Sequence, residues 1–217
     1  MEIIKKTLRQ GRQCTNESIS ACVYESKRSR YPELHRGGVK REKYKVLQKK
    51  YHFDIWHIGP YELHKYLQEI AKYINAQDAK VVVDVGCGLG EMLRHIKAEN
   101  RLGVDVQNDV IEVAKMLSKT DIAYKVGSFD AVDMAEPIDY LVSVGFTHGS
   151  TEEILRPCYY DVAQRNNVKH FVVDTVPEGY DGAHYIDYSI TLPENYKLIE
   201  KMGPFLGGRI IEVYEKC

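Results

Sequence analysis

The sequence has few cysteines and no long apolar run. Its 217 residues include five cysteines, none in a Cys-x-x-Cys pair. This odd, scattered set argues against a disulfide framework or a zinc ribbon and favours a reducing compartment. No segment approaches the roughly 20 apolar residues that cross a bilayer. Charges within the first six residues argue against a secretory signal. We therefore expect a cytoplasmic protein without a membrane span.

Net charge is also nearly absent, at −1, but the charges are unevenly placed. Residues 1–50 carry 14 lysines and arginines against 5 acids, whereas residues 51–217 carry 16 against 26. A basic arm of this kind favours contact with nucleic acid or a phosphorylated substrate. It can equally lie against the acidic body of its own chain or of a partner subunit.

Apolar segments of strand length alternate with helical patterns through most of the chain. A charged helix is predicted over Val39–Lys50, and an apolar stripe at helical spacing runs from Leu63 to Ile74. Farther along, we expect strands and helices in alternation, which predicts a parallel sheet with helices on both faces. The predicted strands are Val81–Val85, Leu102–Val106, Ile122–Val126, Ile138–Val144 and Val168–Asp174, and the predicted helices run through Met92–Ile96, Val110–Leu117 and Glu152–Gln164.

The end of the chain departs from this alternation. Tyr196–Lys201 and Arg209–Tyr214 both alternate like strands, and the connector between them is too short for a crossover helix. These two segments are therefore predicted to form an antiparallel pair.

A glycine-rich turn follows the first predicted strand. The segment Asp84-Val-Gly-Cys-Gly-Leu-Gly-Glu91 places three glycines at alternate positions between two acids. Glycines there permit a tight turn and let a ligand approach the backbone. A dinucleotide fingerprint requires glycine at position 91, so a nicotinamide dehydrogenase is disfavoured. Asp84 and Glu91 indicate a ligand with positive charge instead.

Acids also follow the next two predicted strands. Asp105 ends the second strand, where a carboxylate can accept the ribose hydroxyls of a nucleoside. Asp130 follows the third strand, within Gly127-Ser-Phe-Asp130, in a position suited to an adenine amino group.

Together, the glycine turn, the two acids and the reversed last strand resemble class I S-adenosylmethionine-dependent methyltransferases. The resemblance spans about residues 61–217 and implies a Rossmann-like α/β fold, a seven-stranded sheet with an antiparallel last strand. Residues 1–60 would then be a basic helical extension or lid. The cofactor implied is S-adenosylmethionine, with these contacts: Asp84, Gly86, Cys87, Gly88, Gly90, Asp105, Val106, Ser128, Phe129, Asp130 and Val144.

The loops after the fourth and fifth strands carry the candidate catalytic groups. The Asn/Asp-Pro-Pro-Tyr/Phe motif, frequent in family members that methylate bases or amides, is absent after the fourth strand. His148 is found there instead and is the first candidate base. His184 is the second, in a loop that also holds Tyr180 and Tyr185 as candidate substrate contacts. Asp174 could serve a metal-dependent reaction, but the fourth strand has no matching acid, so we expect no metal.

The segment Phe53-Asp-Ile-Trp-His57 is interpreted either as a lid over the cofactor, through Trp56 and His57, or as a hydrophobic anchor for the arm. With Pro60-Tyr-Glu-Leu63 it resembles methyltransferases encoded among bacterial surface-glycan enzymes. We therefore expect a small hydroxylated acceptor, with O-methylation of a sugar or nucleotide-linked sugar first. An RNA methyltransferase using the basic arm is the alternative.

A non-catalytic cofactor-binding scaffold is the alternative of another class. Five tyrosines, at positions 159, 160, 180, 185 and 188, could then form an interface, such as that of a homo-oligomer.

Overall fold

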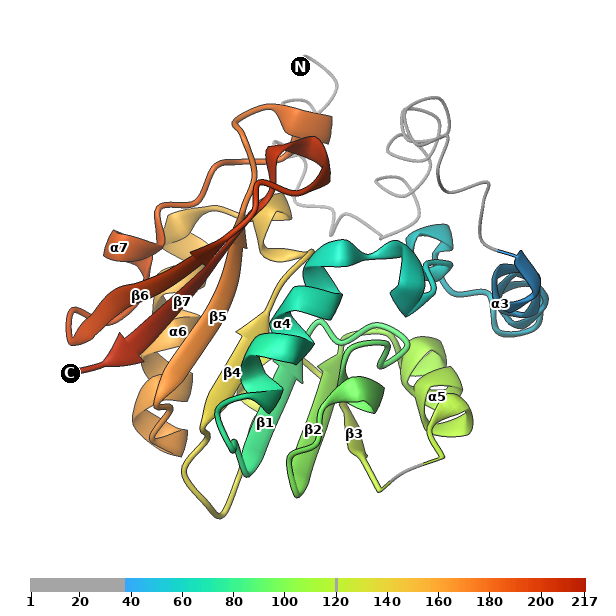
Figure 1. Cartoon of the computed structure of the whole chain (residues 1–217), viewed down its shortest axis with the longest axis horizontal. Helices are drawn as coiled ribbons and strands as arrows, with labels where there is room; N and C mark the ends of the chain where they lie inside the picture. Colours follow the sequence, from blue (N-terminus) through green and yellow to red (C-terminus); the bar gives the residue numbers. More distant parts are fainter. Residues whose placement is uncertain (1–37, 120) are drawn as a thin grey trace, which may run out of the picture. The chain divides into compact units, whose positions relative to one another are not determined.

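The computed structural model describes residues 38–119 and 121–217, which belong to one compact unit (Figure 1). Most of the predicted basic arm, residues 1–37, lies outside the described residues. The helix predicted over Val39–Lys50 is present as α3, Gly38–Tyr51.

Seven strands form one sheet in the order β3-β2-β1-β4-β5-β7-β6. The first five run parallel, and β7 runs antiparallel between β5 and β6. The predicted architecture, with its reversed last strand, is confirmed. The strands are β1 Val81–Val85, β2 Asn100–Asp105, β3 Ala123–Val126, β4 Tyr140–Ser143, β5 His170–Thr175, β6 Tyr196–Met202 and β7 Ile210–Lys216.

Helices cover both faces of the sheet, with α4 and α6 on opposite sides (Figure 1). Successive side chains on a strand point to opposite faces. Val81 and Val83 of β1 accordingly pack in the cluster that includes α6, whereas Val82 packs with α4 and α5. The helices are α4 Lys65–Asn75, α5 Asn108–Leu117, α6 Glu152–Asn166 and α7 Tyr188–Thr191, with short 3-10 turns in the loops.

The prediction of a helix after the glycine turn is wrong. Met92, Leu93 and Ile96 are buried as expected, but only a 3-10 turn, Leu93–His95, forms. Asn75 gives the physical reason. Its amide donates to the His95 carbonyl at 2.8 Å and accepts from the Lys97 N–H at 2.8 Å. These backbone groups are the ones that a continuing helix would need.

The segment before α4 packs against the glycine turn. Tyr44, Phe53 and Ile58 form one buried cluster with Leu89 and with Val110 of α5. The described part of the predicted extension therefore shares apolar core with the residues beyond position 60. Within the described ranges, no helix is long and apolar enough to span a membrane.

The tyrosines considered for an interface do not share one surface. Tyr159 of α6 and Tyr188 of α7 are fully buried in the core, so the alternative in which all five tyrosines form an interface is wrong. Their hydroxyls are satisfied inside the protein, where Tyr159 pairs with Ser143 Oγ at 2.5 Å and Tyr188 with Thr147 Oγ1 at 2.7 Å. Tyr160 and Tyr185 are exposed.

Replacing Tyr159 by phenylalanine should lower the free energy of unfolding by about 1–3 kcal/mol, because Ser143 Oγ would lose its buried partner. Urea unfolding monitored by circular dichroism measures the change. Tyr160→Phe, on the exposed side of the same helix, is the matched control and should stay within about 0.5 kcal/mol of the wild type. Equal stability of the two variants would contradict the role given to this hydroxyl pair.

Candidate functional site

The chemistry-bearing loops meet at one edge of the sheet. The turns after β1, β2, β4 and β5 all lie at the carboxyl ends of parallel strands, where open α/β sheets bind their ligands. Because β7 is antiparallel, its beginning lies at this edge too, with Ile210 paired to Thr175 at the end of β5.

Asp105 fixes the shape of the glycine turn. Its carboxylate is buried and accepts the Gly88 N–H on Oδ2 and the Gln107 N–H on Oδ1, both at 3.0 Å. The Gly86 and Cys87 N–H groups donate to the Val104 carbonyl at 2.8 and 3.0 Å. Gly88 has a φ of +52°, which favours glycine. The turn is thus held in one shape by the end of β2.

Asp84 is a buried carboxylate at the end of β1. No hydrogen bond from the described residues reaches it. Burial, and then the charge of Asp105, raises the pKa of Asp84 to about 8. A buried carboxylate in this state favours a cationic ligand, because a positive charge restores its ionised form.

Glu91, the second acid beside the turn, has a structural role instead. It accepts hydrogen bonds from the Tyr44 hydroxyl and from Arg94, and from the Tyr61 N–H at 2.8 Å. Arg94 neutralises it, so Glu91 does not offer the free charge that the sequence suggested. It ties α3 and the segment before α4 to the turn.

The predicted lid segment lies against the turn. A Cβ added at Gly88 would lie 3.1 Å from His57 Nδ1, so the imidazole covers this glycine. Burial lowers the pKa of His57, while the charges of Asp105 and Asp54 oppose that shift. Asp54 also accepts from Gln107 Nε2 at 2.6 Å. Trp56 is 40% exposed beside it.

The predicted adenine contacts lie in different environments. Asp130 is exposed, and its Oδ1 accepts the Ser128 N–H at 3.1 Å. Phe129 is buried against Tyr159, with ring centroids 4.9 Å apart. Val106 is exposed, and Val144 and Cys87 are buried, the cysteine thiol with a raised pKa because of burial.

His148 lies in the 3-10 turn after β4, Thr147–Gly149. Its Nδ1 is 3.8 Å from Oδ2 of Asp174, a fully buried carboxylate at the end of β5. Asp174 Oδ1 accepts the Gly145 N–H at 3.0 Å, and Arg209 forms an ion pair with Oδ2. The Arg209 guanidinium lies 4.8 Å from the ring centroid of Tyr66. A histidine, a carboxylate and an arginine thus meet at the carboxyl edge of the sheet.

The other candidates after β5 are more exposed. The side chains of His184 and Tyr185 are exposed, and Tyr180 is half-buried. His184 approaches Glu178, with Nδ1 3.7 Å from the carboxylate, while its backbone N–H donates to the His148 carbonyl at 2.9 Å. The loop of His184 is therefore joined to that of His148 through the backbone. Among the described residues, no group of three or more His, Cys, Asp or Glu side chains is arranged to hold a metal ion.

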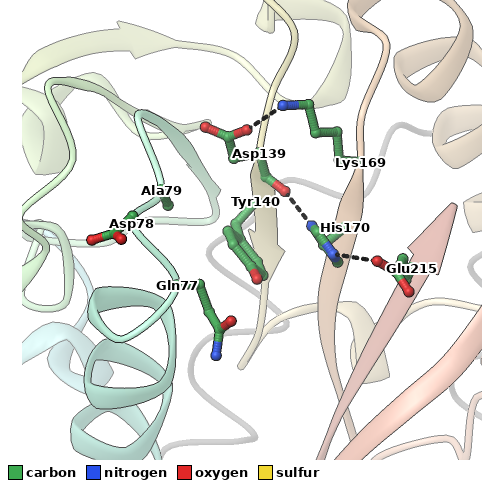
Figure 2. A pocket seen from close by; sticks show the side chains of 8 residues that line it. All are labelled: Gln77, Asp78, Ala79, Asp139, Tyr140, Lys169, His170 and Glu215. Atoms are coloured by element: carbon green, nitrogen blue, oxygen red, sulfur yellow. Dashed lines mark hydrogen bonds and ion pairs between the residues drawn. The ribbon is translucent and has the colours of Figure 1, made fainter.

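A cavity of about 300 Å³ lies at the opposite edge of the sheet (Figure 2). Its charged groups pair with one another, Lys169 with Asp139 at 2.7 Å and His170 with Glu215 at 3.4 Å. Tyr140 stacks on His170, with ring centroids 4.5 Å apart. These contacts close the amino ends of β4 and β5, far from the glycine turn, and none of the predicted site residues lies there.

No family model and no curated protein matches the sequence. Solved structures do match. The N-methyltransferase NodS from Bradyrhizobium japonicum WM9, in complex with S-adenosyl-l-homocysteine, gives a TM-score of 0.63 at 14% identity, over 80% of this chain and 97% of NodS.

Two further structures agree. The amino pentose methyltransferase CalS10 from Micromonospora echinaspora gives a TM-score of 0.58 at 14% identity, over 71% of this chain and 91% of CalS10. Magnesium protoporphyrin IX methyltransferase from Synechocystis PCC 6803 gives a TM-score of 0.57 at 11% identity, over 70% of this chain and 79% of that chain. The chain has the class I methyltransferase fold. At these identities the likeness shows the fold alone.

Several residues of the site were not expected from the sequence. Tyr66 and Arg209 connect Asp84 with Asp174. Burial raises the pKa of the Tyr66 hydroxyl, and the charges of Arg209 and Asp84 both act on that pKa. Phe146 lies over Gly86, where an added Cβ would be 2.3 Å from its ring. The sequence position of Arg209 could have predicted its place in the site, because a residue just before a reversed last strand must lie at the carboxyl edge of the sheet.

Asp84 should make stability depend on pH. Between about pH 4 and pH 8 the unfolded chain loses the Asp84 proton while the folded chain retains it, so this group lowers wild-type stability as the pH rises through that window. Asp84→Asn has no proton to lose. Its free energy of unfolding relative to the wild type should therefore increase from about pH 5 to about pH 8 in urea titrations.

Asp161→Asn is the control, because Asp161 is exposed and its hydrogen bond to Arg165 lowers its pKa. Its difference from the wild type should stay constant over the same window. A constant difference for Asp84→Asn as well would contradict the raised pKa.

Proposed function

We propose that the protein is an S-adenosylmethionine-dependent methyltransferase that acts on a hydroxyl group of a small polar acceptor. The observation that carries the proposal is the pair of buried acids at the glycine turn. Asp84 has a raised pKa and no hydrogen bond from the described residues, and Asp105 adjoins it. These two acceptor groups suit a ligand that combines positive charge with sugar hydroxyls.

The residues of the turn fit this cofactor. Asp84 would pair with its ammonium or sulfonium charge. The Phe146 ring lies over Gly86 and the His57 imidazole over Gly88, so a ligand would reach the backbone of these glycines only where the two rings move aside. Asp105 uses one lone pair on each oxygen for the turn, and each oxygen has a second that can accept a ribose hydroxyl. His57 and Trp56 would cover the bound molecule and exclude water.

When bound, the cofactor supplies a methyl group on a sulfonium, which is transferred by direct displacement. The protein's contribution is then to align the acceptor and to remove its proton. His148 is the base in this proposal, because it lies in the loop after β4 at the carboxyl edge of the sheet and a buried carboxylate lies beside its ring. His184 is a second candidate, but its exposed side chain and its distance from any buried partner favour a substrate-binding role.

A sugar or nucleotide-linked sugar is the proposed acceptor. Tyr180, Tyr185 and His184 present hydroxyl and imidazole groups on the adjoining loop, which suit a polyhydroxylated molecule. Among the compared structures, CalS10 is an amino pentose methyltransferase. A cytoplasmic location remains a proposal, as does a homo-oligomer.

Asp105→Ala should raise the dissociation constant of S-adenosylhomocysteine by about tenfold or more, because charge-assisted hydrogen bonds to the ribose would be lost. Isothermal titration calorimetry measures it. Asp161→Ala, an exposed acid away from the turn, is the matched control and should leave the isotherm unchanged. An unchanged isotherm for Asp105→Ala would remove the ribose assignment.

His148→Gln should lower methyl transfer while leaving S-adenosylhomocysteine affinity within about twofold, because the base does not hold the cofactor. Radiolabelled S-adenosylmethionine is supplied with two pools, nucleotide-sugars with glycans in one and total RNA in the other. Label in the sugar pool that depends on His148 supports the proposal. Label in RNA would overturn the acceptor and assign the basic residues 1–50 to recognition. Wild-type transfer by His148→Gln would exclude His148 as the base.

A further inference from the structure

The carboxylate of Asp174 is the most constrained charge at the carboxyl edge of the sheet. It is fully buried. Oδ1 accepts the Gly145 N–H at 3.0 Å, and Oδ2 contacts Arg209 and lies 3.8 Å from His148 Nδ1. Its neighbours therefore come from two places in the chain, the loop after β4 with Gly145 and His148, and Arg209 just before β7.

We propose that Asp174 is a positioning residue for His148. The carboxylate accepts the proton on Nδ1, which holds the imidazole in the Nδ1–H tautomer, so that Nε2 is the ring nitrogen without a proton. This inference rests on the proposed function, since it assigns a partner to the base named there.

The observed distance is compatible with this role. At 3.8 Å the two atoms are beyond hydrogen-bond range. Catalytic hydrogen bonds are often long before substrate binds and shorten in the complex. Because Gly145 and Arg209 fix the carboxylate, a rotation of the half-buried His148 ring can close the gap, whereas movement of Asp174 would break two contacts.

Arg209 makes a buried carboxylate tolerable at this position. A lone ionised carboxylate out of water costs several kcal/mol, and an excellent ion pair offsets that cost. The guanidinium also lies over the Tyr66 ring, at 4.8 Å from its centroid, so α4 supports it from the other side. Tyr66 therefore packs on Arg209, Arg209 pairs with Asp174, and Asp174 in turn lies beside His148.

The proton of the acceptor hydroxyl goes to His148 in the proposed methyl transfer. The acceptor hydroxyl gives its proton to Nε2 while its oxygen forms the new bond to the methyl carbon, and the bond from that carbon to sulfur breaks with its electron pair left on sulfur. The His148 ring is then an imidazolium, protonated on both nitrogens and carrying one positive charge. Asp174 lies beside that charge and stabilises it.

Nitrogen NMR of the full chain labelled in histidine tests the tautomer without acceptor or cofactor. Spectra are taken at about pH 9, where imidazoles are neutral, and His148→Gln identifies the signal. The wild type should show mainly the Nδ1–H form. Asp174→Asn should lower the ratio of Nδ1–H to Nε2–H by about threefold or more, a change that a merely structural role would not produce. An unchanged ratio in a folded variant overturns the proposal.

Loss of one charge from a buried pair can prevent folding, so the double variant Asp174→Asn with Arg209→Gln is made in parallel. It removes both charges and should show the same change in tautomer ratio. Asp161→Asn, which breaks the exposed pair with Arg165, is the control and should leave the His148 signal unchanged. A change of equal size in the control would also overturn the assignment.

Activity in the labelled pool gives an independent second readout. Asp174→Asn should lower transfer by about tenfold in the wild-type background and by less than about twofold in His148→Gln, because the two residues act as one unit. Equal losses in both backgrounds would show that Asp174 acts on the fold. If S-adenosylhomocysteine does not bind, the proposed function fails while the tautomer result still stands by itself.

Discussion

The site depends on one carboxylate, that of Asp105, which joins three parts of the chain. It ends β2, holds the turn after β1 through Gly88 and holds the start of α5 through Gln107. Because β1 and β2 are neighbouring parallel strands, their ends lie side by side, and one short acidic side chain reaches both. Without this joint the Gly88 N–H would lose its partner at a position where the φ of +52° already limits the backbone.

Three other carboxylates near the same edge differ in how their charge is compensated. Glu91 is paired with Arg94, and Asp174 is paired with Arg209. Asp84 has Asp105 as its charged neighbour, and its pKa rises to about 8 as a result of burial and of that charge. The first two are complete within the protein. No described residue supplies a cation to Asp84, so this carboxylate would gain most from a positive charge on a ligand.

The reversed strand and the segment before α4 bring the end of β1 with Asp84 and the end of β5 with Asp174 into one site. A seventh parallel strand would begin at the amino edge, so Arg209 reaches Asp174 only because β7 runs the other way. Tyr66 of α4 lies within electrostatic reach of both Asp84 and Arg209. The preceding residues cover the turn from outside, through His57 over Gly88 and through Tyr44 on Glu91. Covering a site in this way excludes water and strengthens its electrostatics.

The sequence by itself determined the sheet, its reversed last strand and the position of the glycine turn, because strand periodicity and glycine spacing are local properties. It also located Asp84, Asp105 and His148. The tertiary structure decided which charges are free. Glu91 and Asp84 look alike in the sequence. Glu91 pairs with Arg94, three residues farther on, and the packing of α3 adds the Tyr44 hydroxyl, whereas no described residue gives Asp84 such a partner. Likewise, Arg209 lies 35 residues from Asp174 in sequence, and their pairing follows from strand direction, which brings together groups that no local pattern connects.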